Sequence, residues 1–248
     1  MRRIELQSVA VELPVYDRSD RSLRRQLVRF GSAGLIKRDL KNRIVVRALE
    51  SISFHVDEGE RIALIGRNGA GKSTLLRVLS GVTEPTEGSI SVKGQITTLL
   101  SADSFMDPDQ TGYENIWFAG TLLGMTISQI RAVIPEIEEF VDLGDYMQMP
   151  LRTYSTGMKV RLGFAIATAI HPDVLLLDEA IGAGDIHFAK RAHARAKQLY
   201  DKAKIIVVAS HNEQILRDLC TRGLVLDQGR IVADDTVEKC LEIYAKMG

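Results

Sequence analysis

The stretch that decides the fold is Gly66-Arg67-Asn68-Gly69-Ala70-Gly71-Lys72-Ser73, with Thr74 directly after it. It matches the pattern G-x-x-x-x-G-K-[ST] and lies between an apolar run at 61–65, which predicts a strand, and a segment at 72–80, which predicts a helix. Glycines let a backbone fold closely around phosphate, and the start of the helix adds the positive end of its dipole. Lys72 would bring a positive charge to the outer phosphates, and the Ser73 hydroxyl can bind Mg²⁺. The stretch therefore predicts a phosphate-binding loop.

Two acidic residues follow a second apolar run. Residues 174–177 read Val-Leu-Leu-Leu, as in a buried parallel strand, and Asp178 and Glu179 come next. We expect Asp178 to orient the metal through water and Glu179 to polarise the water that attacks the γ-phosphate. With the phosphate loop, this pair predicts hydrolysis of a nucleoside triphosphate.

Along the chain, predicted strands alternate with predicted helices, which favours an α/β fold with a parallel sheet. Residues 4–15 alternate like a strand, and a hairpin is predicted around Gln228-Gly229. The block at about 105–165 is predicted to be a helical insertion. Within the helical stretch 112–170, breaks are expected at Gly124, Pro135, Gly144 and Pro150.

The charge is unevenly distributed although the formal net charge of the 248 residues is zero. Residues 1–47 hold twelve basic and five acidic side chains, so the rest of the chain carries the opposite excess of seven negative charges. In this basic segment Leu23, Leu27 and Phe30 have helical spacing, which fits either a solvated surface helix or one that docks to a membrane or partner. The two cysteines suggest no disulfide framework, and no apolar run approaches the roughly 18 residues of a membrane span. A cytosolic chain that can still dock to a membrane protein is expected.

A third motif lies between the first two. Tyr154-Ser155-Thr156-Gly157-Met158-Lys159 resembles the signature motif of ABC transporter ATPases, usually written LSGGQ. Ser155 and Gly157 match it, whereas Thr156 and Met158 depart from the usual Gly and Gln. The distance of 23 residues from Ser155 to Asp178 also resembles the family. The resemblance implies that this segment closes on the γ-phosphate of a nucleotide bound by a second copy.

The resemblance also implies roles for residues that would not indicate a function by themselves. It implies that Asp185 lies in the D-loop, that His211 contacts the γ-phosphate, and that Tyr16 stacks on adenine. The glutamine that usually ligates the metal is absent, because its place near residues 101–103 has Ala102 as the closest match. Water or Asp103 could substitute there.

The departures from the family pattern resemble one subgroup, the ATPase subunits of ABC-2 polysaccharide exporters, which move O-antigen, capsule or teichoic acid precursors. The residues that carry this resemblance are the Y-S-[ST]-G-M segment, D-E-A-x-G-A-G-D at 178–185 and the stretch 107–115. The implied fold is a RecA-like core with an N-terminal antiparallel β subdomain and an inserted helical subdomain. The resemblance implies that residues 1–248 form one such domain, and no additional carbohydrate-binding domain is expected. The predicted divisions are a core with β subdomain at 1–103 and 166–248, a helical subdomain at 104–165 and a basic insertion at 17–47.

The same resemblance implies that ATP and Mg²⁺ bind, and that two copies sandwich the nucleotides head to tail. It implies a transmembrane permease, in two copies, at the cytoplasmic face of the inner membrane, with a lipid-linked glycan as substrate and no nucleic acid. The alternatives are another ABC-2 exporter, of drug or haem type, a soluble ABC ATPase of DNA repair or translation, and a phosphate-loop kinase. The soluble ABC ATPase is disfavoured because such proteins usually carry two cassettes or a long coiled coil, and this chain has neither. The kinase is disfavoured because the chain has the signature segment and His211, which resembles the switch histidine of ABC ATPases.

Overall fold

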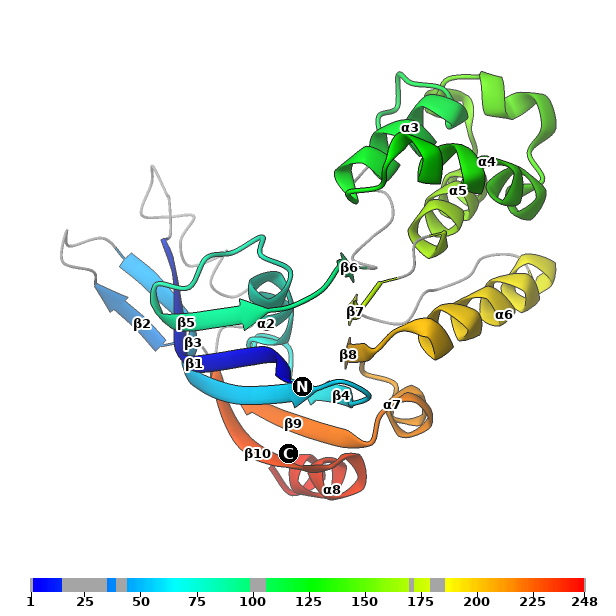
Figure 1. Ribbon diagram of the computed structural model, residues 1–248. Coiled ribbons are helices and arrows are strands. Elements are labelled where there is room, and N and C mark those ends of the chain that lie inside the picture. The colour runs from blue at the N-terminus through cyan, green and yellow to red at the C-terminus, as the bar shows by residue number, and fades with distance from the viewer. Residues whose placement is uncertain are drawn as a thin grey trace. The chain divides into compact units, whose positions relative to one another are not determined.

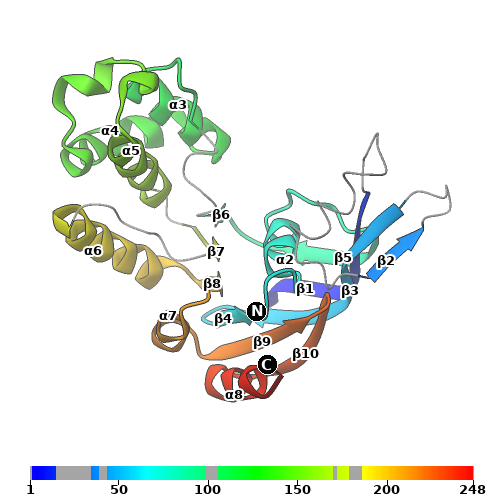
Figure 2. The ribbon, with the colours of Figure 1, turned by 180° about the vertical axis from the view of Figure 1, so that it is seen from behind.

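The computed structural model describes residues 2–14, 35–38, 44–98, 106–169, 172–178 and 186–247. The chain divides into two compact units, which Figures 1 and 2 show from opposite sides. Unit 1 comprises Met1–Gln95, Leu176–Ala180 and Lys204–Gly248, and unit 2 comprises Ile96–Leu175 and Ile181–Ala203.

Unit 1 contains an antiparallel sheet with the strand order β2-β3-β1-β5. Its strands are β1 (Arg2–Pro14), β2 (Leu35–Arg38), β3 (Ile44–Asp57) and β5 (Glu87–Val92). Ile4 and Leu6 of β1 are buried, in the alternation of a half-buried strand. The register with β3 then shifts after Leu6, near the positive φ of Ser8, and the alternation is lost. The strand predicted at 4–15 is thus present and belongs to the antiparallel subdomain.

Unit 1 also contains most of a second, mainly parallel sheet, in which the strand order runs β10-β9-β4-β8 and then residues 176–178 of β7. β10 pairs with β9 in the antiparallel sense. β4 (Arg61–Ile65) pairs in parallel with β8 (Ile205–Ala209) on one side and with β9 (Arg222–Asp227) on the other. Side chains along β8 are buried without interruption, as expected for a strand covered on both faces. The remaining elements are β7 (Val174–Asp178), β10 (Arg230–Thr236), α2 (Lys72–Leu79), α7 (Glu213–Leu219) and α8 (Val237–Met247), which packs against β9.

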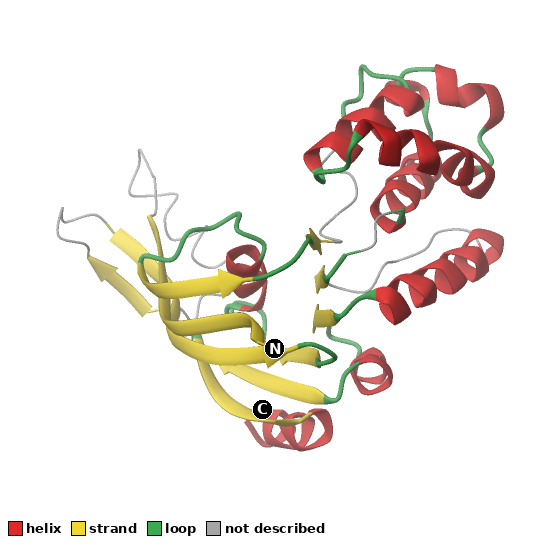
Figure 3. Cartoon of the chain, viewed as in Figure 1, coloured by secondary structure: helices red, strands yellow, loops and turns green. Residues whose placement is uncertain are grey.

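The described part of unit 2 is mostly helical (Figure 3). It contains β6 (Ile96–Thr98), α3 (Gly112–Leu122), α4 (Ile127–Val141), η2 (Gly144–Gln148), η3 (Leu151–Thr153), α5 (Thr156–Thr168) and α6 (Ile186–Lys202). Phe140, Phe164 and Phe188 form a triangle of ring contacts in its core, with centroids 5.3–6.1 Å apart. Three different helices therefore share one aromatic core.

The helix break predicted at Pro135 is wrong, because α4 continues through this residue. Because proline has no N–H, the carbonyl four residues earlier, that of Arg131, loses its usual helical hydrogen-bond donor. Both residues lie on the exposed face of α4, where water can solvate that carbonyl. The buried face, with Ile130, Ile137 and Phe140, keeps its packing. Among the described residues, no helix has the length and apolarity needed to cross a membrane.

Candidate nucleotide site

The phosphate loop, residues 66–71, connects β4 to α2, as the sequence predicts. Gly71 is the N-cap residue of α2 and has a φ of +110°, a conformation that favours glycine. No side chain caps the start of this helix. An uncapped helix N-terminus at the end of a buried strand is suited to an anion, which can accept hydrogen bonds from the first-turn N–H groups.

Lys72 stands at the first position of α2 with its side chain only 8% exposed. Its ammonium Nζ donates to the carbonyl oxygens of Gly66 at 2.6 Å and Arg67 at 3.0 Å. These bonds hold the charge across the loop, which brings it within reach of a phosphate that the loop would bind. The aliphatic stem is buried while the charged end reaches polar partners.

The parallel register places Ser210 and His211 at the same edge of the sheet as the phosphate loop. Leu64 of β4 is the register partner of Ala209 of β8, so both strands reach their carboxyl ends together. Ser210 is buried and its hydroxyl accepts a hydrogen bond from the Asn212 N–H at 3.1 Å. This tight turn presents the exposed His211 side chain at the strand end.

Asp178 is the last residue of β7, the neighbour of β8 in the strand order, and is half-buried. Ser73 is exposed at the start of α2. A hydroxyl and a carboxylate are the hard oxygen ligands that Mg²⁺ accepts, and this ion usually fills its other positions with water and phosphate oxygens. Ser73 and Asp178 therefore suit a magnesium ion that is bound together with a nucleotide.

The signature segment lies in unit 2 at the start of α5. Ser155 is the N-cap residue, and its hydroxyl accepts a hydrogen bond from the Met158 N–H at 3.3 Å. Ser155, Thr156 and Gly157 are exposed, whereas Met158 packs on the core of unit 2. Tyr154 is buried and donates its hydroxyl hydrogen to the carbonyl oxygen of Tyr146 at 2.6 Å. An anchored tyrosine thus precedes an exposed helix N-terminus.

Several predicted site residues lie outside the described part of the chain. They are Tyr16, Glu179 and Asp185, together with Ala102 and Asp103 of the glutamine position. The helix predicted at Leu23, Leu27 and Phe30 also lies outside it.

Two residues of the β9–β10 hairpin, which the motifs do not include, contact the phosphate loop. Gly229, in the turn between β9 and β10, donates its N–H to the carbonyl oxygen of Ala70 at 3.0 Å. Leu226 of β9 approaches Gly66 so closely that a Cβ on Gly66 would lie 2.4 Å from its carbonyl oxygen. The sequence predicts the Gln228-Gly229 hairpin, but no local signal indicates what its tip contacts.

A parallel α/β core with a phosphate loop between a buried strand and a helix defines the class of phosphate-loop nucleotide-binding proteins. Residues 49–182 match the family model described as ABC transporter. The chain belongs to the ABC transporter family, as its signature segment predicts.

Curated relatives carry related names. The chain is 41% identical over 231 residues to the O-antigen export system ATP-binding protein RfbE of Yersinia enterocolitica, covering 93% of this chain and 97% of that protein. It is 37% identical over 197 residues to an O-antigen export ATP-binding protein, RfbB, of Klebsiella pneumoniae, covering 79% and 80%. It is 39% identical over 197 residues to the teichoic acids export ATP-binding protein TagH of Bacillus anthracis, covering 79% of this chain and 36% of that protein. These names agree with the subgroup that the sequence resembles.

Solved structures confirm the predicted fold class. An ATP-binding subunit of an ABC transporter superposes with a TM-score of 0.69 at 21% identity, covering 99% of this chain and 94% of that one. A dimeric ATP-binding cassette in a post-hydrolysis state with ADP and Pi superposes with a TM-score of 0.67 at 19% identity, covering 94% and 98%.

Proposed function

We propose that this chain is the ATP-hydrolysing subunit that powers export of a lipid-linked polysaccharide, of the O-antigen, capsule or teichoic acid type. The observation that carries the proposal is the 41% identity to an O-antigen export ATP-binding protein, which extends over nearly the whole of both chains. The geometry of the phosphate loop, with Lys72 held across it, supports the ATPase part. The alternative is an ABC-2 exporter of drug or haem type.

In this proposal each residue at the sheet edge has a separate role in binding or hydrolysing ATP. Backbone N–H groups of the loop and the Lys72 ammonium hold the β- and γ-phosphates. Magnesium, when bound, would neutralise phosphate charge, and Ser73 and Asp178 would hold it, the latter through water. Glu179 accepts a proton from the water that attacks the γ-phosphorus, while the bond between γ-phosphorus and the bridging oxygen breaks to release ADP. His211 contacts the γ-phosphate, and Tyr16 stacks on the adenine.

A second copy of the chain is expected to complete each nucleotide site. Ser155 and Gly157 are exposed at a helix N-terminus, an arrangement that can receive a phosphate from another molecule. Head-to-tail pairing would place this segment of one copy on the γ-phosphate bound by the other, with Asp185 in the D-loop beside it. ATP would then draw the two copies together, and hydrolysis would release them.

The experiment on the ATPase uses Glu179→Gln, which removes the base but keeps the side-chain shape. The variant should bind ATP, accumulate as an ATP-bound dimer in size-exclusion chromatography and lose nearly all turnover. Lys72→Ala serves as the comparison, because it should weaken ATP binding itself and give no dimer. Undiminished hydrolysis by Glu179→Gln would overturn the assignment of the base.

The contact with a transmembrane permease, in two copies at the cytoplasmic face of the inner membrane, is expected in unit 2. Phe118 and Leu122 are one helical turn apart on α3 and are 44% and 55% exposed. We expect Phe118→Ser to reduce co-purification with the permease while ATP binding persists. Val82→Ser is the matched control, since Val82 is 73% exposed but lies in unit 1.

The substrate class is tested by stimulation of the assembled complex. A lipid-linked glycan should raise ATP hydrolysis, and a drug or haem should not. The basic segment 17–47 is proposed to meet anionic headgroups or the pyrophosphate of that substrate. Reversing the charges of Arg24, Arg25 and Arg29 should lower export and leave basal hydrolysis unchanged, and unaffected export would identify the segment as solvated surface.

A further inference from the structure

The hairpin formed by β9 and β10 contacts the phosphate loop although it lies about 160 residues later in the chain. We propose that the tip of this hairpin holds the phosphate loop in its binding conformation, which makes Gly229 a positioning residue for nucleotide. The inference rests on the proposed function, because it takes residues 66–73 as the nucleotide site.

The first step is a hydrogen bond that fixes one peptide plane of the loop. The Gly229 N–H donates to the Ala70 carbonyl oxygen at 3.0 Å, and the Gly229 carbonyl accepts from the Glu50 N–H at 2.8 Å. The described peptide bonds are trans, so the carbonyl of Ala70 and the N–H of Gly71 point in opposite directions. Holding the Ala70 carbonyl toward the hairpin therefore turns the Gly71 N–H away from it, toward the side on which an anion would sit.

The second step is the close approach of backbone to backbone at both ends of the loop. A Cβ on Gly66 would lie 2.4 Å from the Leu226 carbonyl oxygen, and a Cβ on Gly71 would lie 2.9 Å from the Ala48 carbonyl oxygen. The Cα of Gly229 lies 3.6 Å from that same hypothetical Cβ on Gly71. The loop glycines thus serve the packing against β9 and its turn as well as the approach of phosphate.

The third step is the shape of the turn itself. Gln228 and Gly229 have φ values of +46° and +79°, the combination that a two-residue type I′ hairpin turn requires. A Cβ on Gly229 would lie 2.7 Å from the Ala48 carbonyl oxygen, which is backbone and cannot rotate aside. Any side chain at 229 would therefore push the tip away and lengthen its bond to Ala70.

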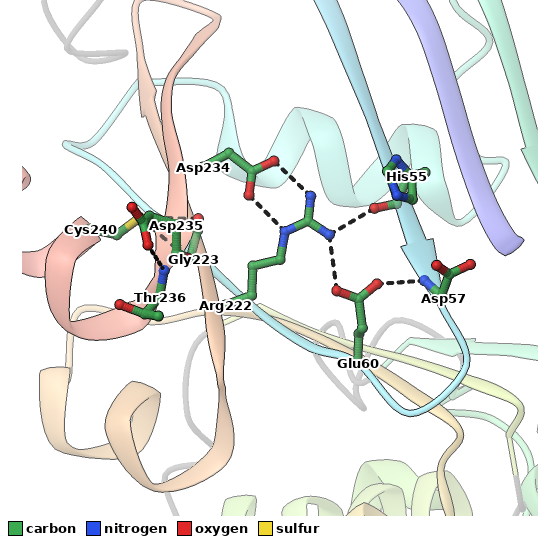
Figure 4. A network of polar contacts seen from close by, with 9 residues as sticks. All are labelled: His55, Asp57, Glu60, Arg222, Gly223, Asp234, Asp235, Thr236 and Cys240. Carbon is green, nitrogen blue, oxygen red and sulfur yellow. Dashed lines mark hydrogen bonds and ion pairs between the residues drawn. The ribbon is translucent and has the colours of Figure 1, made fainter.

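The other end of the hairpin is anchored by Arg222 (Figure 4). Its guanidinium donates twice to Asp234 of β10, at 2.7 and 2.6 Å. Its Nη1 donates to Glu60 and to the His55 carbonyl oxygen, both at 3.0 Å. Because His55 belongs to β3 and Glu60 precedes β4, this one side chain joins both strands of the hairpin to the rest of unit 1. A hairpin that is fixed at its base can position its tip.

The test compares two Gly→Ala substitutions at positions with similar positive φ values, so that both variants lose a similar amount of stability from backbone strain. Gly229→Ala should misplace the Gly71 N–H that points toward the phosphate. Misplacing one hydrogen bond to a charged group should raise the Kd for ADP at least about tenfold. Gly81 has a similar φ of +75° but open space around its Cβ position, so Gly81→Ala should lower stability without changing the Kd. Both constants are measured by titration calorimetry at a temperature where circular dichroism shows each variant to be folded. A Kd for Gly229→Ala equal to that of Gly81→Ala would overturn the inference.

Lys72→Ala separates this inference from the function on which it rests. If Lys72→Ala leaves ADP binding intact, the phosphate loop is not the nucleotide site and the proposed function fails. If Lys72→Ala abolishes binding while Gly229→Ala does not weaken it, only the positioning role fails.

Amide hydrogen exchange tests the same coupling in the unaltered protein, which covers the case in which Gly229→Ala does not fold. ADP binding should slow exchange of the Gly229 N–H more than that of the Gly59 N–H. Gly59 is a matched turn glycine, whose N–H donates to the Lys204 carbonyl oxygen at 2.8 Å at the opposite end of β4 from the loop. Equal responses of the two amides would refute the positioning role.

Discussion

Replacing Asn115 by alanine should destabilise unit 2 far more than the loss of one polar side chain suggests. Asn115 lies in the first turns of α3 and is completely buried. Its Oδ1 accepts from the Asp107 N–H at 2.7 Å. Its Nδ2 donates to the carbonyl oxygens of Asp107, Gln110 and Thr111 at 3.0, 3.2 and 2.9 Å. One amide thus holds the turn at 107–111 against the helix that follows it.

The size of the effect follows from these hydrogen bonds. The Nδ2 group has two hydrogens shared among three carbonyl oxygens, so with the bond to Oδ1 the side chain makes the equivalent of three hydrogen bonds, each of about 1 kcal/mol net. The backbone groups left behind would also lose a partner in a buried place. Water that enters the vacated space would recover part of this, so we expect Asn115→Ala to lower the free energy of unfolding by about 3 kcal/mol.

The assay is a urea titration followed by tryptophan fluorescence. The chain has a single tryptophan, Trp117, which lies on α3 and packs on the core of unit 2, so its emission reports unfolding of that unit. Asp109→Ala is the control in the same turn. It removes the exposed Asp109–Arg152 ion pair, whose side chains are 75% and 63% exposed, and should lower the free energy by about 0.5 kcal/mol or less. A loss below about 1 kcal/mol for Asn115→Ala would refute the reasoning.

Three further substitutions test unit 1. Arg222→Met should lower the free energy of unfolding by about 2 kcal/mol, because Asp234 and Glu60 lose the arginine that they share. Far-ultraviolet circular dichroism in urea measures this, and an unchanged unfolding midpoint would contradict it. Burial raises the pKa of the Cys220 thiol to about 12 from 9.0, so the folded state keeps this proton at higher pH than the unfolded state does. Its stability contribution is complete below pH 9 and is lost as the pH rises toward 12, at up to about 1.4 kcal/mol per pH unit, and Cys220→Ala should show a flatter decline. Gly88→Ala should lower stability by about 2 kcal/mol or more, because φ is +81° and its Cβ would lie 2.4 Å from backbone oxygens of β1; a thermal melt equal to that of the unaltered protein would count against it.

Local features were predictable where short-range chemistry decides them. The phosphate loop lies between a strand and a helix as expected, because its glycines and the helix start act within eight consecutive residues. Ser155 caps the start of α5 because its hydroxyl accepts a hydrogen bond from the Met158 N–H, as serine before a helix commonly does. By contrast, the break expected at Pro135 is wrong, since solvent exposure of α4 decides whether a free carbonyl is tolerated.

By itself, the sequence determined the class of protein, the order of its motifs and the elements that carry them, since each motif contains its own glycines, charge and helix start. Only the tertiary structure decided what surrounds those motifs. The β9–β10 turn is visible in the sequence as Gln228-Gly229, but its contact with Ala70 depends on parallel pairing of β4 with β9. The contacts of the Asn115 amide with four backbone groups likewise depend on how the chain turns before α3. Contacts between backbone groups leave no trace in side-chain patterns, because every residue type except proline has the same N–H and carbonyl groups to offer.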